Sequence, residues 1–386
     1  MSWKRKLRSD WGRLGMKCEL GAICTYRKGR IEVSKLNQTT YISTENMLPN
    51  KCGIVSSSNL PNTLTTQEFQ PNDVLVSNIR PYFKKIWLAK YCGGCSNDVL
   101  VFTANKDVDP IFLYYVLSDD TFFSYATATA KGTKMPRGDR TSIMQYSVPE
   151  YDLSTQKKIS AILGSLDDKI RLNNKINENL QQQAQALFKS WFIDFTPFDG
   201  IKPDNWFKYF LGDVTQMSAG GDKPKVTSVT KSEECPYPIY SNGLESEGLY
   251  GYTNRAKIFV ESVTVSARGT IGFVCLRHFP YVPIVRLITL VPDEAFLSAK
   301  YLYLYLKQLN ITGTGTTQQQ LTVPDFRKTE ILIPDKTTMG KFTGLVAPLF
   351  GKIWANENEN VQLSSLRDAI LPKLMSGEID VTNIPI

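Results

Sequence analysis

An internal repeat is the feature of this sequence that most constrains its fold. The two copies are displaced by 183 residues, the separation of Ile170 and Ile353. A Lys-Ile pair in each copy is followed at the same spacing by two asparagines and a leucine, which are Asn173, Asn177 and Leu180 in the first copy and Asn356, Asn360 and Leu363 in the second. A repeat of this length predicts two similar structural units in tandem.

The repeated segments carry apolar residues at alternating steps of four and three, the spacing of a helix that packs along another helix. The predicted seam consists of Ile159, Leu163, Leu166, Ile170, Asn173, Asn177, Leu180 and Leu187, and of Val346, Leu349, Ile353, Asn356, Asn360, Leu363 and Ile370. Asparagines in mid-seam favour one pairing register at the expense of stability. Two amphipathic helices packed on separate domains are the alternative interpretation.

The first helix is expected to begin near Ser154, as N-cap, and to end before Pro197. Its roughly 40 residues would span about 60 Å. Pro348 and Pro372 interrupt the second copy, so the sequence leaves open a kink or a shorter helix there.

The segments upstream of the two helices share an order of elements. Strands are predicted at 73–77 and 98–102, then a helix at 111–115; the second segment repeats this with strands at 262–266 and 284–288 and a helix at 301–305. A Gly-Thr loop follows each helix, at Gly132 and Gly315, and each segment opens alike, at Leu20-Gly21 and Leu211-Gly212. The loops otherwise differ, as expected for two domains of one fold with different targets.

Composition favours a basic, cytoplasmic protein. Lys and Arg exceed Asp and Glu by 45 to 37, which suits a polyanionic partner. No apolar run long enough for a membrane span occurs. Seven cysteines, including the Cys92/Cys95 pair, suit free thiols, and a single histidine, His278, predicts neither a metal site nor a catalytic role.

Several stretches resemble one family, the specificity subunits of Type I restriction-modification systems. They are 156–159 (QKKI), 166–170 (LDDKI), 184–188 (AQALF), 191–195 (WFIDF) and 366–379 (LRDAILPKLMSGEI). The second segment also has the family's Leu211-Gly212-Asp213 opening, whereas the first has Leu20-Gly21-Ala22.

The resemblance implies target recognition domains of α/β (α+β) type at 1–150 and 199–335, with helical regions at 151–198 and 336–386. The two long helices would pair as an antiparallel coiled coil with pseudo-two-fold symmetry. Each domain would bind half of a split site on double-stranded DNA, and the chain would carry two methyltransferase subunits and, through them, restriction subunits. S-adenosylmethionine, ATP and magnesium are expected on those partners, with no cofactor or metal on this chain.

Candidate DNA contacts lie in a turn and a loop of each domain. In the first domain they are Arg80, Lys84, Lys85, Lys131, Lys134, Arg137 and Arg140; in the second they are Arg268, Thr316, Thr317, Gln318, Gln319 and Gln320. Arginine can pair with guanine edges and glutamine with adenine edges. Phosphate contact or simple solvation is favoured over base reading for each arginine, and the glutamine run is also typical of a polar loop without a binding role.

An enzyme is not expected, because neither a phosphate-binding loop nor an amino-methyltransferase motif is present. A two-domain adaptor with a helical spacer that binds no DNA is the alternative function.

Overall fold

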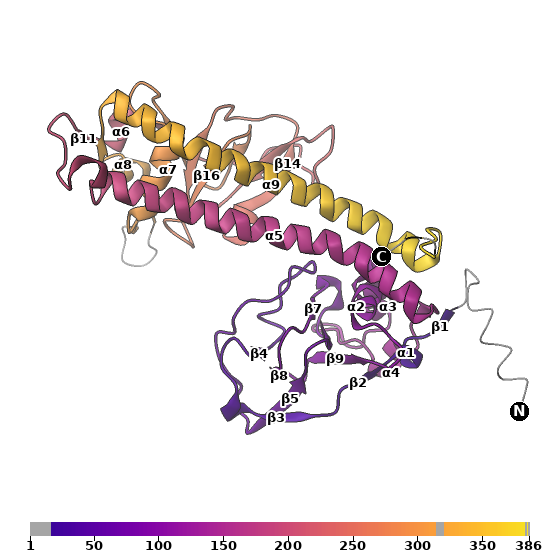
Figure 1. Ribbon diagram of the computed structural model, residues 1–386. Coiled ribbons are helices and arrows are strands. Elements are labelled where there is room, and N and C mark those ends of the chain that lie inside the picture. Colours follow the sequence, from indigo (N-terminus) through magenta and orange to yellow (C-terminus); the bar gives the residue numbers. More distant parts are fainter. Residues whose placement is uncertain (1–16, 314–319, 383, 385–386) are drawn as a thin grey trace, which may run out of the picture. The chain divides into compact units, whose positions relative to one another are not determined.

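The computed structural model describes residues 17–313, 320–382 and 384 (Figure 1). The chain divides into two compact units. The first unit comprises Met1–Asn173 and Asn358–Ile386, and the second comprises Asn174–Glu357. Each of the two long helices therefore contributes to both units.

The first unit contains a two-stranded sheet, β1-β10, and two four-stranded sheets, β2-β9-β6-β7 and β3-β5-β8-β4. Its strands are β1 Lys17–Glu19, β2 Cys24–Tyr26, β3 Arg30–Glu32, β4 Tyr41–Ile42, β5 Thr65–Phe69, β6 Val74–Ser77, β7 Ile86–Leu88, β8 Gly93–Cys95, β9 Val99–Ala104 and β10 Ser147–Pro149. Its short helices are α1 Leu20–Ile23, α2 Pro110–Ser118, α3 Asp120–Ala128 and α4 Arg140–Met144.

The second unit contains sheets β11-β19, β12-β18-β15-β16 and β14-β13-β17. Its strands are β11 Phe207–Phe210, β12 Thr215–Ala219, β13 Tyr237–Tyr240, β14 Leu249–Thr253, β15 Ser262–Val265, β16 Val274–Arg277, β17 Val282–Pro283, β18 Ile288–Pro292 and β19 Glu330–Ile333. Its short helices are α6 Leu211–Val214, α7 Ala299–Gln308 and α8 Val323–Phe326.

The two units share a strand order. In the first unit the main sheet runs β2-β9-β6-β7, and in the second it runs β12-β18-β15-β16, with every neighbouring pair antiparallel. Each unit also has a parallel pair, β4 with β8 and β13 with β17. The repeat in the sequence thus corresponds to a repeated topology.

The repeat extends to the local contacts that close each domain. The amide of Leu20 donates to the carbonyl of Tyr146 at 2.8 Å, and that of Leu211 donates to Thr329 at 2.9 Å. Both leucines are fully buried, so each anchors the start of its domain in the core.

One strand prediction was wrong. Residues 284–287 are not in a strand, and β18 begins only at Ile288. Val285 and Arg286 have φ angles of 52° and 60°, in the left-handed region. The amides of both residues donate to a Gly-Gly pair, Gly221 and Gly220, at 2.9 Å each. This pairing forms a turn where the apolar run Ile284-Val285 suggested an extended chain.

The long helices are α5, Leu153–Phe192, and α9, Lys336–Ser376. The N-terminal cap of α5 is Asp152 and not Ser154, because the Asp152 carboxylate accepts a 2.7 Å hydrogen bond from the amide of Thr155. The second helix is not shortened at its prolines, since α9 continues through Pro348 and Pro372. Burial of Val346 and Phe350, on either side of Pro348, stabilises the helix where proline removes a backbone donor.

Both helices complete the domain cores. In the first unit, Ile159 and Leu163 of α5 and Leu371 and Leu374 of α9 belong to the same buried cluster. In the second unit, Phe188 and Phe192 of α5 share a cluster with Phe342 and Val346 of α9. No helix within the described residues is long and apolar enough to cross a membrane.

Candidate nucleic-acid interface

Every predicted seam residue is buried or half-buried. In the first unit, the Asn173 amide donates to Glu359 at 2.8 Å and to Asn360 at 3.0 Å. In the second unit, the Asn356 amide donates to Asn177 at 2.7 Å. The mid-seam asparagines of the two helices therefore contact each other or their immediate neighbours.

The direction of the helices follows from these contacts. In the first unit Asp167 contacts Arg367 and Asn173 contacts Asn360. As residue numbers increase along α5, the numbers of the residues that they contact on α9 therefore decrease. In the second unit Asn177 contacts Asn356 and Phe188 packs against Phe342, in the same sense. The two helices run in opposite directions within each unit.

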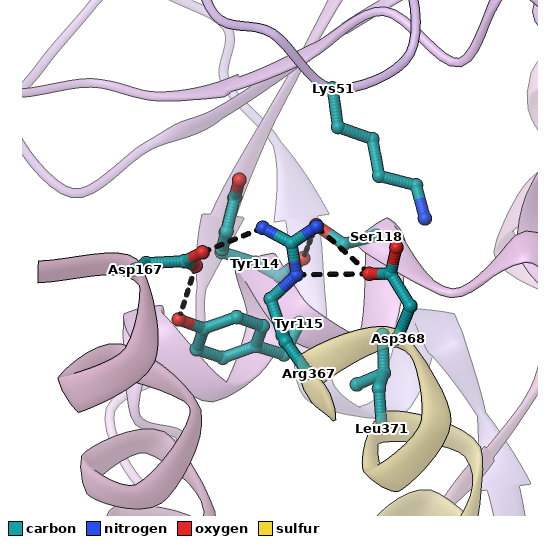
Figure 2. Close-up of a pocket in the computed structure, with 8 residues that line it drawn as sticks. All are labelled: Lys51, Tyr114, Tyr115, Ser118, Asp167, Arg367, Asp368 and Leu371. Atoms are coloured by element: carbon teal, nitrogen blue, oxygen red, sulfur yellow. Dashed lines mark hydrogen bonds and ion pairs between the residues drawn. The ribbon is translucent and has the colours of Figure 1, made fainter. Parts of the chain in front are cut away.

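A polar cluster joins α2, α5 and α9 in the first unit, and Figure 2 shows its side chains around a small pocket. Arg367 donates to Asp167 at 2.7 Å, and the hydroxyl of Tyr115 donates to the other oxygen of the same carboxylate at 2.7 Å. Arg367 also pairs with Asp368 at 2.8 Å. Both members of the Asp167–Arg367 pair are about three-quarters buried, and with Tyr115 the pair links α2 to the two long helices.

The candidate turn of the first unit follows β6. It contains a short 3-10 helix, Pro81–Phe83, between Arg80 and Lys84, whose φ angles of 51° and 52° are left-handed. Backbone hydrogen bonds hold both sides of the turn, from Arg80 to Pro136 at 2.8 Å and from Asn50 to Phe83 at 2.8 Å. This turn is therefore rigidly presented.

The candidate loop lies against this turn. Lys131 and Arg137 exchange two backbone hydrogen bonds of 2.9 Å, and the amide of Gly138 donates to Asn78 at 3.2 Å. Together with the bond from Arg80 to Pro136, these contacts place turn and loop side by side. The structure thus brings together two basic regions that are some 50 residues apart in the sequence.

Several of the cations are paired with acidic side chains. Arg137 pairs with Asp98 at 3.1 Å, Lys131 pairs with Asp139, and Lys84 pairs with Asp120 at 2.8 Å. The Lys131 ammonium, followed by the Ser142 amide, lowers the pKa of Asp139 to about 2. Burial opposes ionisation of Asp120, but hydrogen bonds from Lys51 and Lys84 outweigh it and lower the pKa of that carboxyl. Ion pairing orients these cations and reduces the net charge that they display.

The other candidates of the first unit differ in their contacts. Arg140 donates to the carbonyl of Asn97 at 3.2 Å, and Lys85 donates to that of Thr44 at 2.6 Å. Among the described residues, Arg80 and Lys134 form no ion pair. Lys134 is exposed. Exposed Arg140 likewise forms no ion pair within the described part of the chain, so the charges of these three cations are not offset by an acidic partner.

The second unit repeats the arrangement with different side chains. Exposed Arg268, in the turn after β15, donates to the side chain of Gln320 at 2.9 Å, and the amide of Leu321 donates to Ala267 at 3.0 Å. Turn and loop are again adjacent. Thr316, Thr317, Gln318 and Gln319 lie outside the described residues.

A buried arginine of the second unit was missed by the sequence analysis. Arg277 is 1% exposed; it donates to Glu247 at 2.7 Å and to Thr264 at 3.1 Å, and its guanidinium lies 3.7 Å from the centre of the Tyr240 ring. No local pattern marks it, because its partners lie on separate segments. Full pairing gives it a structural role.

His278 stacks on Trp354 of α9, with ring centres 4.1 Å apart and planes 16° apart. Burial, aided by the positive charge of Lys300, lowers the pKa of this histidine to about 4. Within the described part of the chain, no cluster of His, Cys, Asp and Glu could hold a metal ion. The cysteines there are free thiols.

A family model for the Type I restriction modification DNA specificity domain matches residues 15–182 and 203–341. The chain belongs to this family. The two matched segments correspond to the two repeats of the fold, so this is a specificity protein with two recognition domains.

Known members of the specificity family are similar along most of their length. The specificity subunit of the Type I restriction enzyme HindI of Haemophilus influenzae is 26% identical, over 96% of this chain and all of the relative. That of MjaIX from Methanocaldococcus jannaschii is 27% identical, over 71% and 70%. The crystal structure of the S subunit from M. genitalium has the same fold, with a TM-score of 0.58 at 17% identity over 96% of this chain and 98% of that one.

Proposed function

We propose that this specificity subunit reads a split DNA site, with the recognition domain of each unit contacting one half. The observation that carries the proposal is the repeated topology with unlike surfaces. The turn and loop of the first unit display lysine and arginine, whereas those of the second display Arg268 and Gln320. Two domains of one fold with different contact residues suit two different half-sites.

The helices would then set the gap between the half-sites. We propose that α5 and α9 form an antiparallel coiled coil, related by a pseudo-two-fold axis, with the paired asparagines fixing its register. A helix of about 60 Å corresponds to roughly 17 base pairs of duplex, which is an upper bound on the separation.

Partner subunits would supply the chemistry. We propose that two methyltransferase subunits dock on the helices and adjoining surfaces and that restriction subunits join through them. S-adenosylmethionine, ATP and magnesium would then be bound by these partners. Exposed apolar side chains on both helices, Leu172, Leu345, Val361 and Leu366, are suitable for such docking.

The test is an exchange of residues 199–335 for the second recognition domain of another family member. Methylome sequencing of the host is expected to show that one half of the modified site changes while the other half is retained. A change in both halves, or in neither, would contradict the assignment of one domain to each half.

A gel-shift series with the purified chain and its methyltransferase subunit separates this function from that of an adaptor. A DNA reader retains one sequence in preference to scrambled competitors, and the preference survives added salt better than non-specific binding does. An adaptor shows no sequence preference.

A further inference from the structure

The turn after β6 carries an exposed aromatic pair that the proposed reading of DNA by charged side chains leaves unused. The rings of Tyr82 and Phe83 lie 4.8 Å apart, and these residues are 48% and 39% exposed. The backbone of this turn is restricted by Pro81 and by two residues in the left-handed conformation, and hydrogen bonds fix it on both sides. The two aromatic side chains are therefore held at the surface. Exposed aromatic side chains on a strained, rigid turn point to a binding role.

The surroundings of the pair identify the kind of partner. Arg80, Lys84 and Lys85 flank the two rings in sequence, and the Lys85 ammonium lies 5.9 Å from the centre of the Phe83 ring. The basic loop that contains Lys134 and Arg137 lies against the same turn. Aromatic side chains flanked by basic residues suit a surface that combines phosphates with apolar groups, and a DNA groove is such a surface.

The geometry of the rings favours contact with the edge of a base pair over insertion between base pairs. Each residue is more than half covered, and the two rings pack against each other with their planes 59° apart, so part of each ring is already occupied by its neighbour. The apolar group that duplex DNA offers at base edges is the C5-methyl of thymine, in the major groove.

The second unit has no equivalent pair. The matching turn, between β15 and β16, is described in full; Arg268 is exposed there, and its aromatic residue, Phe273, is partly buried. Of the two matching turns, only that of the first unit carries an exposed aromatic pair.

We propose that Tyr82 and Phe83 read the methyl group of a thymine in the half-site bound by the first unit. This inference rests on the proposed function, because it assigns a contact within that interface. It requires that this half-site contains an A·T pair within reach of the turn.

The experiment uses the full chain with its methyltransferase subunits and the cognate duplex. Each thymine is replaced in turn by uracil, which removes only the methyl group. We expect one position, in one half-site, at which affinity falls about fourfold, the effect of one methyl-sized group leaving an apolar contact. Because this change is made in the DNA, the result does not depend on how any protein variant folds.

Protein variants then connect the methyl group to the rings. Tyr82→Ala and Phe83→Ala are expected to weaken cognate binding and to make binding insensitive to uracil at that position. Tyr82→Phe retains the ring and the sensitivity. Phe207→Ala, which removes a 59% exposed aromatic side chain from the second unit, serves as the matched control and is expected to leave the sensitivity unchanged.

The outcomes separate the two levels of the argument. Site-specific binding without a methyl-dependent position, or with a sensitivity that survives both alanine variants, overturns the inference alone. A fluorescent base analogue that reports unstacking at the turn's position also overturns it, in favour of insertion. If the wild-type complex shows no preference for any DNA sequence, both the proposed function and this inference are overturned.

Discussion

Arg367 shows how one side chain distinguishes the two halves of the repeat. It occupies the seam position where the first copy has Ala184, and it pairs with Asp167, whose counterpart in the second copy is Phe350. In the second unit Ala184 and Phe350 belong to an apolar cluster. The same position in the repeat is therefore polar in one unit and apolar in the other, which disfavours exchange of the two helices' roles.

Removal of either partner of this pair is expected to destabilise the first unit. Asp167→Ala and Arg367→Ala should each lower the free energy of unfolding by about 2 kcal/mol, since Arg367 is then left with Asp368 alone, or Asp167 with the Tyr115 hydroxyl alone. The double variant should cost little more than either single variant, which gives a coupling energy of about 1–2 kcal/mol in urea titrations. Additive losses would show that the pair is not coupled.

The half-buried ring of His278 should make the stability of the protein depend on pH. Because its pKa in the folded protein is about 4, against about 6.5 for an unperturbed histidine, its contribution to stability is complete above pH 6.5 and is lost as the pH falls toward 4. The loss is about 1–2 kcal/mol after allowance for the exposed part of the ring.

The measurement is the difference in unfolding free energy between the wild type and His278→Phe at pH 7.5 and pH 4.5. The variant retains an aromatic ring against Trp354 and cannot be protonated, so it should become relatively more stable at the lower pH. An identical pH dependence of the two proteins would refute the assignment.

The asparagines in the seam of α5 and α9 reduce the stability of the folded protein. Asn356 is 1% exposed, and its side-chain oxygen has no hydrogen-bond partner among the described residues. Replacing Asn177 and Asn356 together by leucine should raise the free energy of unfolding by about 1–2 kcal/mol, because two desolvated amides are removed from an apolar surface.

The same double variant should lose register specificity if the asparagines fix the pairing. Modified sites in the host genome would then show a wider range of gap lengths, while Asn358→Leu, on an exposed position of α9, should change neither property. A double variant that is less stable than the wild type would contradict this account.

The elements that could be predicted were those with a strong local pattern. The heptad spacing predicted a helix at α5, and apolar β-branched runs predicted strands at β6, β9 and β15. The strand expected at 284–288 was wrong, because contacts of Val285 and Arg286 with Gly220 and Gly221, more than 60 residues away, impose a turn. Long-range hydrogen bonds of this kind leave no signature in the local sequence.

The candidate interface followed the same rule. Charge density identified the turn and loop of the first unit, but their adjacency depends on backbone bonds between Arg80 and Pro136 and between Asn78 and Gly138. The pairing of Arg137 with Asp98 and of Arg277 with Glu247 likewise joins segments far apart in the chain. The sequence alone shows where the charged residues lie along the chain, whereas the residues that they pair with are known only from the fold.

If α5 and α9 set the separation of the two half-sites, as proposed, lengthening both helices should lengthen the gap in the modified DNA site. Insertion of one heptad at matched positions in α5 and α9 adds about 10 Å, or roughly three base pairs. The modified site should retain both half-site sequences with a longer gap, as read by methylome sequencing. An unchanged gap in an active complex would show that the helices do not set the separation.

The closure of the first core by the end of α9 has a consequence for how the protein is made. Leu371, Leu374 and Val381 belong to the buried cluster of the domain that is synthesised first. During translation the first segment of this unit, which ends at Asn173, is completed nearly two hundred residues before Leu371 is synthesised. Its apolar surface therefore stays exposed during that interval. A chain that stops before residue 371 is therefore expected to be cleared by proteases, so that incomplete products do not accumulate as competitors for DNA.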